Sequence, residues 1–370
     1  MSFSLISFKR VLGSALAVSA ALSTVACATP VVSSTPTPVA FKACMVSSRE
    51  GFDDSGANAA AYYGLLQSEA QFGPRTSVVQ VSPDAGIDDF SAALDKLVKR
   101  DCNLVFGVGQ QLVAPVRMAA TAHPEVEFAL VDAVLTSGKG NELDLPNVKN
   151  IEFDATQVAF MAGYLAASQT GSSTIGLIAG ARSHANLNQV YAFRQGVQYF
   201  DSKHAKSTVL IGAIGDAPET WSFLGSNPTK QEIHLKVSGM TNAGADVIYQ
   251  VGLPGLYVTK LVAAHPDVLV IGTDSDWWTQ PGFADFKKLV LASSTKKIAE
   301  AVVRTVGDAV SGIFVGGTGG SWLGTVGTGD VQLTEQHDVP YSIGVQGELD
   351  SIKADLISGN LSIDALTFDS

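Results

Sequence analysis

The sequence has few of the residues from which catalytic and metal sites are built. Its 370 residues include six histidines and three cysteines, and neither a His-Glu-x-x-His nor a Gly-x-Ser-x-Gly motif occurs. Residues 107–109 (Gly-Val-Gly) begin no complete dinucleotide-binding loop, and residues 316–320 (Gly-Gly-Thr-Gly-Gly) lack the lysine of a phosphate-binding loop. His123 and His265 each precede a proline at the end of a predicted helix, where a structural role is the default. We therefore expect no enzymatic activity, no cofactor and no metal ion.

Basic residues are scarce as well. There are 24 Lys and Arg against 35 Asp and Glu, which gives a formal net charge of −11, and no run of basic residues occurs. Because nucleic-acid phosphates require a basic stripe, this composition argues against nucleic acid as a partner.

No apolar run reaches the length of a membrane-spanning helix. The longest uncharged apolar run near the start, residues 11–26, has about 16 residues, whereas a spanning helix needs about 20. Lys9 and Arg10 precede it, as in the basic and apolar parts of a secretory signal peptide. We assign residues 1–26 to a signal peptide.

Cys27 lies where this signal peptide is expected to end. Residues 24–27 (Thr-Val-Ala-Cys) fit the lipobox pattern, in which the cysteine becomes the acylated N-terminus, and this is the interpretation we favour. The alternative is ordinary cleavage after Ala28. Residues 28–40 are uncharged and rich in Thr, Pro, Val and Ser, so residues 27–40 are predicted to form an extended, lipid-anchored linker.

Cys44 and Cys102 remain as an even pair in an oxidising compartment, each at the start of a predicted strand. If the two strands are neighbours in a parallel sheet, they are close enough for a disulfide. We favour a bridge over two buried thiols.

The remaining chain alternates short apolar runs with amphipathic stretches, which predicts βαβ units and parallel sheets. A first series of strands is expected at residues 41–48, 77–82, 102–109, 126–132 and 148–153, and a second at 174–179, 208–214, 246–251 and 268–273. The fold class is therefore α/β, with two doubly wound lobes joined by a hinge. We assign residues 41–154 and 276–315 to the N-terminal lobe, and residues 155–275 and 316–370 to the C-terminal lobe.

Polar residues follow several of these strands, at the edge where parallel sheets bind ligands. Residues 50–58, with Asp53, Asp54 and Asn58, open the first helix together with Tyr62. They either cap that helix or bind a neutral polar ligand. Asp132 and Asp274 end two apolar strands, where a carboxylate either caps the next helix or accepts hydrogen bonds from vicinal hydroxyls.

Two further residues belong to the same predicted edge. Gly252 either forms a plain turn or lets the backbone approach a ligand. Lys296 is predicted to begin a helix over residues 296–311, where it either reaches the cleft or lies on a solvated face.

Several segments in order resemble the basic membrane protein (BMP) family of lipoproteins, the PnrA-like purine nucleoside-binding proteins of ABC transporters. The segments are residues 51–54 with Asn58, 102–109, 128–132, 159–167, 245–249 and 293–296. The resemblance implies a type I periplasmic-binding-protein fold that serves as the receptor of an importer.

The resemblance also implies roles for individual residues. Asp53, Asp54 and Asn58 match polar ligand contacts, and Tyr62 matches an aromatic that stacks on the base. Asp132 matches a carboxylate at the base edge, Asp274 one at the ribose, and Lys296 a further polar contact. The chain departs from the family pattern at residues 56–57, which are Gly-Ala. Phe193 either supplies a second aromatic wall or belongs to a core helix.

The expected partners follow from this family. They are a small-molecule ligand, most simply a purine nucleoside, the ABC permease subunits, and the membrane through the lipid anchor on its extracytoplasmic face. We expect a monomer. The alternatives are a ligand sensor, a binding protein for another polar solute such as a sugar, and a secreted nucleoside-processing enzyme.

Overall fold

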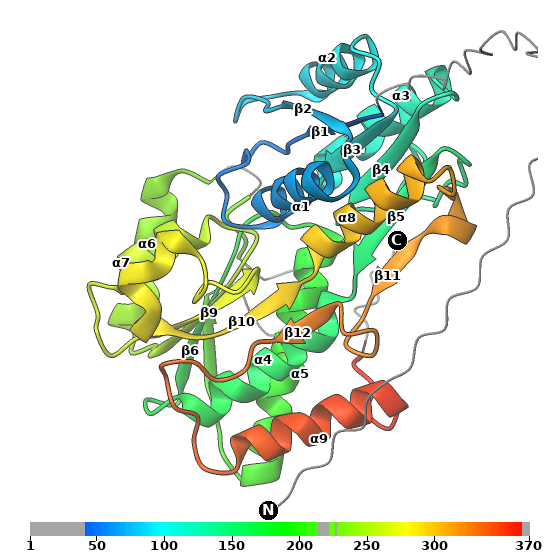
Figure 1. The fold of residues 1–370 in the computed structure, drawn as a ribbon. Coiled ribbons are helices and arrows are strands. Elements are labelled where there is room, and N and C mark those ends of the chain that lie inside the picture. The colour runs from blue at the N-terminus through cyan, green and yellow to red at the C-terminus, as the bar shows by residue number, and fades with distance from the viewer. Residues whose placement is uncertain (1–40, 213–221, 226–227, 365–370) are drawn as a thin grey trace, which may run out of the picture. The chain divides into compact units, whose positions relative to one another are not determined.

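The computed structural model describes residues 41–212, 222–225 and 228–364. The predicted signal peptide, Cys27, the linker and the last two residues of the strand expected at 208–214 lie outside these ranges. Within them the chain forms two sheets, each with helices on both faces (Figure 1).

The first sheet is parallel throughout the described ranges. Its strands lie in the order β11 (Trp322–Gly324), β5 (Val148–Phe153), β4 (Glu127–Val131), β3 (Leu104–Val108), β1 (Lys42–Val46) and β2 (Arg75–Val79). Strand β3 is a continuous apolar run, and β4 is one after its first residue, Glu127, as expected where helices cover both faces.

The second sheet has the same construction, with one antiparallel strand at its edge. The order is β12 (Val331–Leu333), β10 (Val290–Lys296), β9 (Leu269–Asp274), β8 (Val247–Val251), β6 (Thr174–Ala179) and β7 (Val209–Gly212). The predicted α/β class with two doubly wound parallel sheets is therefore correct.

Each sheet has its own helices. The first packs against α1 (Ala57–Phe72), α2 (Ile87–Val98), α3 (Val113–Ala122) and α8 (Ile298–Val310). The second packs against α4 (Ala155–Gln169), α5 (His184–His204), α6 (Lys230–Asn242), α7 (Gly255–Val262) and α9 (Val345–Ser358). Short 3₁₀ helices are η1 (Gln110–Leu112), η3 (Pro281–Leu289) and η4 (Thr318–Gly320). Within the described ranges, no helix combines the length and apolarity needed to cross a bilayer.

The chain passes between the two lobes at three places, after β5, after β10 and after β11. These crossings lie side by side, because Asp154 N–H donates to the Gly324 carbonyl at 2.8 Å and Lys297 N–H donates to the Asp330 carbonyl at 2.8 Å. Short parallel connections of this kind are where hinge motion between lobes occurs.

Two strands lie in the sheet opposite to the one that the predicted lobe boundaries assign. Strand β10 falls within the predicted N-terminal segment 276–315 but pairs in the second sheet, and β11 falls within the predicted C-terminal segment 316–370 but pairs in the first. The local sequence pattern predicts that a segment forms a strand, but it does not say which sheet the strand joins, because its pairing partners lie far away in the sequence. The other lobe limits stay a prediction.

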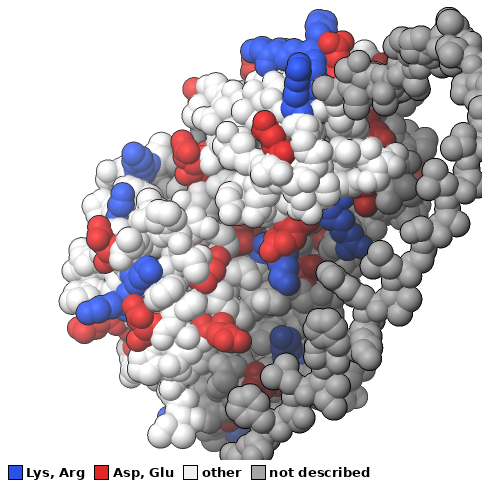
Figure 2. Space-filling view, in the orientation of Figure 1, with Lys and Arg blue, Asp and Glu red and all other residues white. Residues whose placement is uncertain are grey.

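Acidic and basic side chains are interspersed on the described part of the surface drawn in Figure 2, where they form no continuous basic stripe.

The second lobe's interior is tightly packed where α4 crosses α5. A Cβ atom added at Gly163 would lie 2.0 Å from the Phe193 carbonyl oxygen, and one at Gly196 would lie 1.9 Å from that of Phe160. Only glycine permits this approach.

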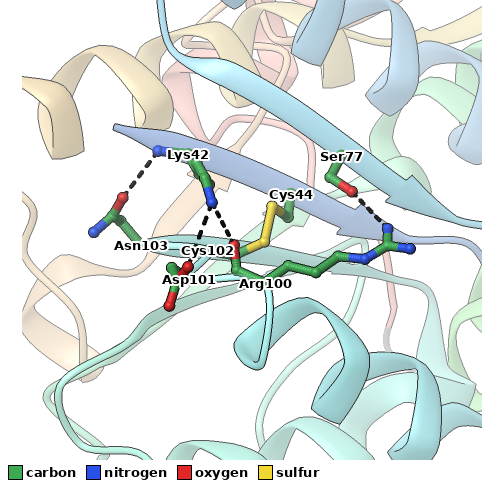
Figure 3. Close-up of a disulfide and its surroundings, with 7 residues drawn as sticks. All are labelled: Lys42, Cys44, Ser77, Arg100, Asp101, Cys102 and Asn103. Carbon is green, nitrogen blue, oxygen red and sulfur yellow. Dashed lines mark hydrogen bonds and ion pairs between the residues drawn. A yellow bond between two sulfur atoms is a disulfide. The ribbon is translucent and has the colours of Figure 1, made fainter. Parts of the chain in front are cut away.

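Cys44 of β1 and Cys102, two residues before β3, form a disulfide with their Cα atoms 6.0 Å apart (Figure 3). The two strands are parallel neighbours, with Cys44 opposite Val105. Both cysteines are buried. The bridge therefore joins the middle of β1 to the segment that leads into β3, away from the carboxyl ends of these strands.

Candidate functional site

Asp132 and Asp274 lie at the carboxyl ends of strands in different sheets. Asp132 directly follows β4 in the first lobe, and Asp274 is the last residue of β9 in the second. Both have left-handed backbone conformations, with φ of 56° and 68°. Aspartate tolerates this conformation better than most residues, and it turns each carboxylate out of its strand direction. The two predicted strand-end carboxylates therefore belong to opposite lobes.

Lys296 joins these two carboxylates. It is the last residue of β10, so the sequence-based assignment to the start of a helix is wrong, since α8 begins at Ile298. Its Nζ lies 2.7 Å from Asp132 Oδ2 and 2.9 Å from Asp274 Oδ1. Lys296 thus makes an ion pair within its own lobe and another across to the first lobe.

The ion pairs are largely shielded from solvent. The Lys296 side chain is 6% exposed, and those of Asp132 and Asp274 are 28% and 22% exposed. Burial by itself lowers the pKa of Lys296, but the charges of the two aspartates and the hydrogen bonds to them outweigh it and raise the pKa. Since the pKa is raised, the lysine stays charged at neutral pH, and the stabilisation from its pairing with the ionised aspartates is lost only as the pH rises above about 10.

The loop after β1 is organised by Asp54. Its Oδ1 accepts hydrogen bonds from the backbone N–H groups of Gly56 (2.8 Å) and Ala59 (3.0 Å). Its Oδ2 accepts from the Asn58 N–H (3.1 Å) and side-chain amide (2.7 Å). Burial raises the pKa of the Asp54 carboxyl, and these hydrogen bonds offset part of the rise. Asp54 thus caps the start of α1, as one of the two roles predicted from the sequence, and its ligand contact stays a prediction.

Asn58 supports this loop from beneath. It is 2% exposed, and its amide donates to Ser48 Oγ and Asp54 while its oxygen accepts from the Ser48 N–H at 2.8 Å. Both amide hydrogens are used, so Asn58 presents no free donor to a ligand in this structure. In this structure Asn58 positions Asp54, and its predicted role as a direct ligand contact stays a prediction.

Asp54 and Asp274 approach each other at Gly56. A Cβ atom added at Gly56 would lie 3.4 Å from Asp54 Oδ2 and 3.6 Å from Asp274 Oδ2, which are ordinary contact distances. The residue at which the chain departs from the family pattern thus leaves a space beside two carboxylates. Ser275 Oγ also donates to the Ser55 carbonyl at 3.0 Å, which links the two lobes. Ser55 lies within residues 50–58 and Ser275 follows Asp274, but nothing in the local pattern distinguishes the two serines from neighbouring residues.

The other predicted residues are placed differently. Asp53 is exposed, and Tyr62 of α1 is half-buried and packs against Phe52, with ring centroids 5.0 Å apart. Gly252 has φ of 62°, and a Cβ atom there would lie 2.7 Å from the Asn186 side chain. The left-handed backbone of Gly252 favours glycine, and a larger residue would also displace the Asn186 amide.

Phe193 does not line the site. It is completely buried, belongs to the core of the second lobe, and stacks on Tyr249 with ring centroids 4.4 Å apart. The alternative of a core helix is the correct one, because the close crossing of α4 and α5 encloses this residue.

The arrangement suits reversible binding of a polar, uncharged molecule. It brings together the carboxylates of Asp54, Asp132 and Asp274, which accept hydrogen bonds from hydroxyls. The shielded ammonium group of Lys296 donates hydrogen bonds. Within the described ranges, no group of three or more His, Cys, Asp or Glu side chains could hold a metal ion.

Residues 41–365 match the model of one protein family, described as "ABC transporter substrate-binding protein PnrA-like" (Bmp). The match covers all the residues that the structure describes. The chain belongs to this PnrA-like family. The family consists of solute-binding proteins of ABC transporters and not of enzymes, and the resemblance stated from the sequence is confirmed.

Curated relatives agree with this assignment at low identity. Basic membrane protein D of Borreliella burgdorferi is 25% identical over 228 residues, which cover 61% of this chain and 60% of that protein. The chain thus matches about three fifths of that relative's length. The ABC transporter nucleoside-binding protein BmpA of Lactococcus lactis is 24% identical over 295 residues, which cover 75% of this chain and 77% of that protein.

Solved structures confirm the fold of this PnrA-like chain. An ABC transporter solute-binding protein of Aeropyrum pernix superposes with a TM-score of 0.72 at 19% identity, covering 89% of this chain and 94% of that one. One from Conexibacter woesei has a TM-score of 0.65 at 18% identity, covering 88% and 99%. The two lobes therefore form a periplasmic-binding-protein fold.

Proposed function

We propose that this PnrA-like chain is the extracytoplasmic solute-binding lipoprotein of an importer and that it binds a purine nucleoside between its lobes. The observation that carries the proposal is the cluster of Asp132, Lys296 and Asp274, in which groups from both lobes meet at the carboxyl ends of their sheets. The name of the Lactococcus lactis relative supports a nucleoside as the ligand.

The ribose is expected beside Gly56. Asp274 uses Oδ1 for Lys296, while its Oδ2 faces Gly56 and has no hydrogen bond within the described residues. A carboxylate in this position accepts from a sugar hydroxyl, and Asp54 Oδ2 lies 3.4 Å from the Cβ position of the same glycine. We therefore expect the two vicinal hydroxyls of the ribose to donate to Asp274 and Asp54.

The base is expected to lie toward Tyr62 and Asp132. Tyr62 presents a half-buried ring that Phe52 holds in place, and stacking of this kind contributes about 1–3 kcal/mol per base. Asp132 supplies an acceptor for a donor on the base edge, and Asp53 is a further polar group at the exposed end of the loop. The proposal uses the predicted contacts Asp53, Asp54, Tyr62, Asp132, Asp274 and Lys296. Phe193 is enclosed in the core and takes no part.

Binding is expected to close the lobes about their three adjacent connections. Ligand groups that bridge Asp54 of the first lobe and Asp274 of the second stabilise the closed form. The permease subunits then recognise that form. No covalent step is involved.

Calorimetry tests the ligand class. The secreted chain is expected to bind at least one of adenosine, guanosine and inosine with a dissociation constant of about 1 µM or tighter, and ribose more weakly. Asp274→Ala is expected to weaken binding several-fold or more because a ribose hydroxyl loses its acceptor. Asp267→Ala, an exposed aspartate before β9, is the matched control and should bind normally. The absence of heat with these nucleosides, cytidine and ribose would remove the nucleoside proposal and leave the fold.

Radiolabelled palmitate tests the anchor at Cys27. Two archaeal relatives, from Pyrococcus horikoshii and Pyrococcus abyssi, are named as uncharacterised lipoproteins. We expect label on the wild-type chain and none on Cys27→Ser, with the variant released from the membrane fraction. An unlabelled wild-type chain would instead indicate cleavage after Ala28 and a freely diffusing protein.

A further inference from the structure

The first lobe has a basic hollow at the edge of its sheet opposite to the ligand site. The hollow has a volume of about 400 Å³ and lies at the amino ends of β1 and β2. It is lined by Lys42, Arg75, Thr76, Ser77, Arg100 and Asp101. Three cations thus gather from three separate segments, on a chain whose net charge is −11.

Two of the cations are held in position by neighbouring groups. Lys42 Nζ donates to the Arg100 carbonyl at 2.6 Å and lies 3.6 Å from Asp101 Oδ2 (Figure 3). Arg100 Nη1 donates to Ser77 Oγ at 3.0 Å. Arg75 is exposed, and its side chain makes no hydrogen bond or ion pair within the described residues. The guanidinium of Arg75 is thus available to an anion.

The acidic residues near the hollow compensate these charges only in part. The Asp101 side chain is 92% exposed, so solvent screens its pairing with Lys42. Glu69 accepts from Thr76 Oγ1. Thr76 and Ser77 are successive residues of β2, so their side chains point to opposite faces of the sheet. Glu69 therefore lies on the α1 side, away from Arg100.

The disulfide fixes the geometry of this surface. Cys44 lies two residues after Lys42, and Cys102 lies two residues after Arg100. The bridge joins the two segments that carry these cations, as Figure 3 shows. Because the disulfide already restrains the backbone on which Lys42 and Arg100 lie, this surface loses little conformational entropy when an anion binds.

We propose that this basic hollow contacts the phosphate groups of anionic lipids in the membrane to which the chain is tethered. The inference rests on the proposed anchoring at Cys27. Strand β1 begins at Lys42, so the cations lie where the linker of residues 27–40 enters the folded lobe. An extended linker spans about 3.1 Å per residue, which keeps the hollow near the bilayer at a high effective concentration.

The net negative charge of the chain does not oppose this contact at physiological ionic strength. Charges farther away than about 10 Å are screened at 0.1 M salt, so the local cations dominate. Each Lys or Arg near an anionic surface strengthens binding by about fivefold. The ligand site lies at the opposite strand ends, and it stays clear of the membrane when this edge faces the lipid.

Vesicle co-sedimentation tests the proposal with the secreted chain carrying Cys27→Ser, which has no lipid. We expect binding at about 0.1 M salt, where charges beyond about 10 Å are screened, to phosphatidylcholine vesicles that contain phosphatidylglycerol, and none to phosphatidylcholine alone. Lys42→Gln/Arg75→Gln/Arg100→Gln should lower the bound-to-free ratio by about tenfold or more. Arg75→Gln alone, which breaks no described contact, should lower it by about threefold to fivefold.

The control changes the same charge elsewhere. Lys260→Gln/Lys288→Gln/Lys353→Gln alters three exposed lysines of the second lobe and should bind like the parent chain. The proposal is overturned if the parent does not bind the anionic vesicles, if Arg75→Gln and the triple variant bind like the parent, or if free inorganic phosphate binds tightly at the same residues without vesicles. Neither a nucleoside nor an acylated Cys27 enters this assay, so its failure is distinguishable from failure of the proposed function.

Discussion

Replacing Lys296 with methionine is expected to abolish ligand binding and to lower the free energy of unfolding by about 3 kcal/mol. The substitution keeps the apolar stem but removes the charge between Asp132 and Asp274, whose carboxylates are mostly shielded from water. These two acids would then face each other without a counter-ion. Chemical denaturation and calorimetry on the same preparation measure the two effects.

Two comparisons separate the loss of charge from the loss of volume. Lys288→Met changes an exposed lysine and should leave both stability and binding unaltered. In an Asp274→Asn background, Lys296→Met should be less destabilising, because one of the two unpaired acids has been neutralised. A Lys296→Met variant as stable as the wild type, with unchanged affinity, would show that the ion pairs between the lobes have no part in the site.

Removing the disulfide is expected to have the largest effect on stability. The bridge closes a loop with a sequence separation of 58 residues, for which chain entropy predicts a loss of about 4 kcal/mol in the Cys44→Ala/Cys102→Ala variant. Both side chains are buried, so the variant also loses packing. Thermal and denaturant unfolding curves with and without a reducing agent provide the measurement.

The reducing agent supplies the internal control for that experiment. It should destabilise the wild type but leave Cys44→Ala/Cys102→Ala unaffected, since the variant has no bond to reduce. Ligand affinity should change little, because the bridge lies at the strand ends opposite the site. Detection of two free thiols in the secreted protein, with no response to reductant, would contradict the expectation.

The sequence by itself determined the architecture of this PnrA-like chain. Continuous apolar runs such as residues 104–108 and 128–131 belong to strands covered on both faces, and their alternation with helices leads to parallel sheets. Because parallel strands present their carboxyl ends at one edge, the polar residues after them, Asp54, Asp132 and Asp274, were identifiable as site candidates.

Only the tertiary structure decided how those residues are used. Lys296 ends a strand instead of beginning a helix, Asn58 is occupied beneath its loop, and Phe193 is enclosed by the crossing of two helices. Likewise, Lys42, Arg75 and Arg100 form no cluster in the sequence, yet they line one hollow. The physical reason is that ion pairs, burial and strand neighbours depend on residues far apart along the chain, whereas periodicity reports only which local structure each segment adopts.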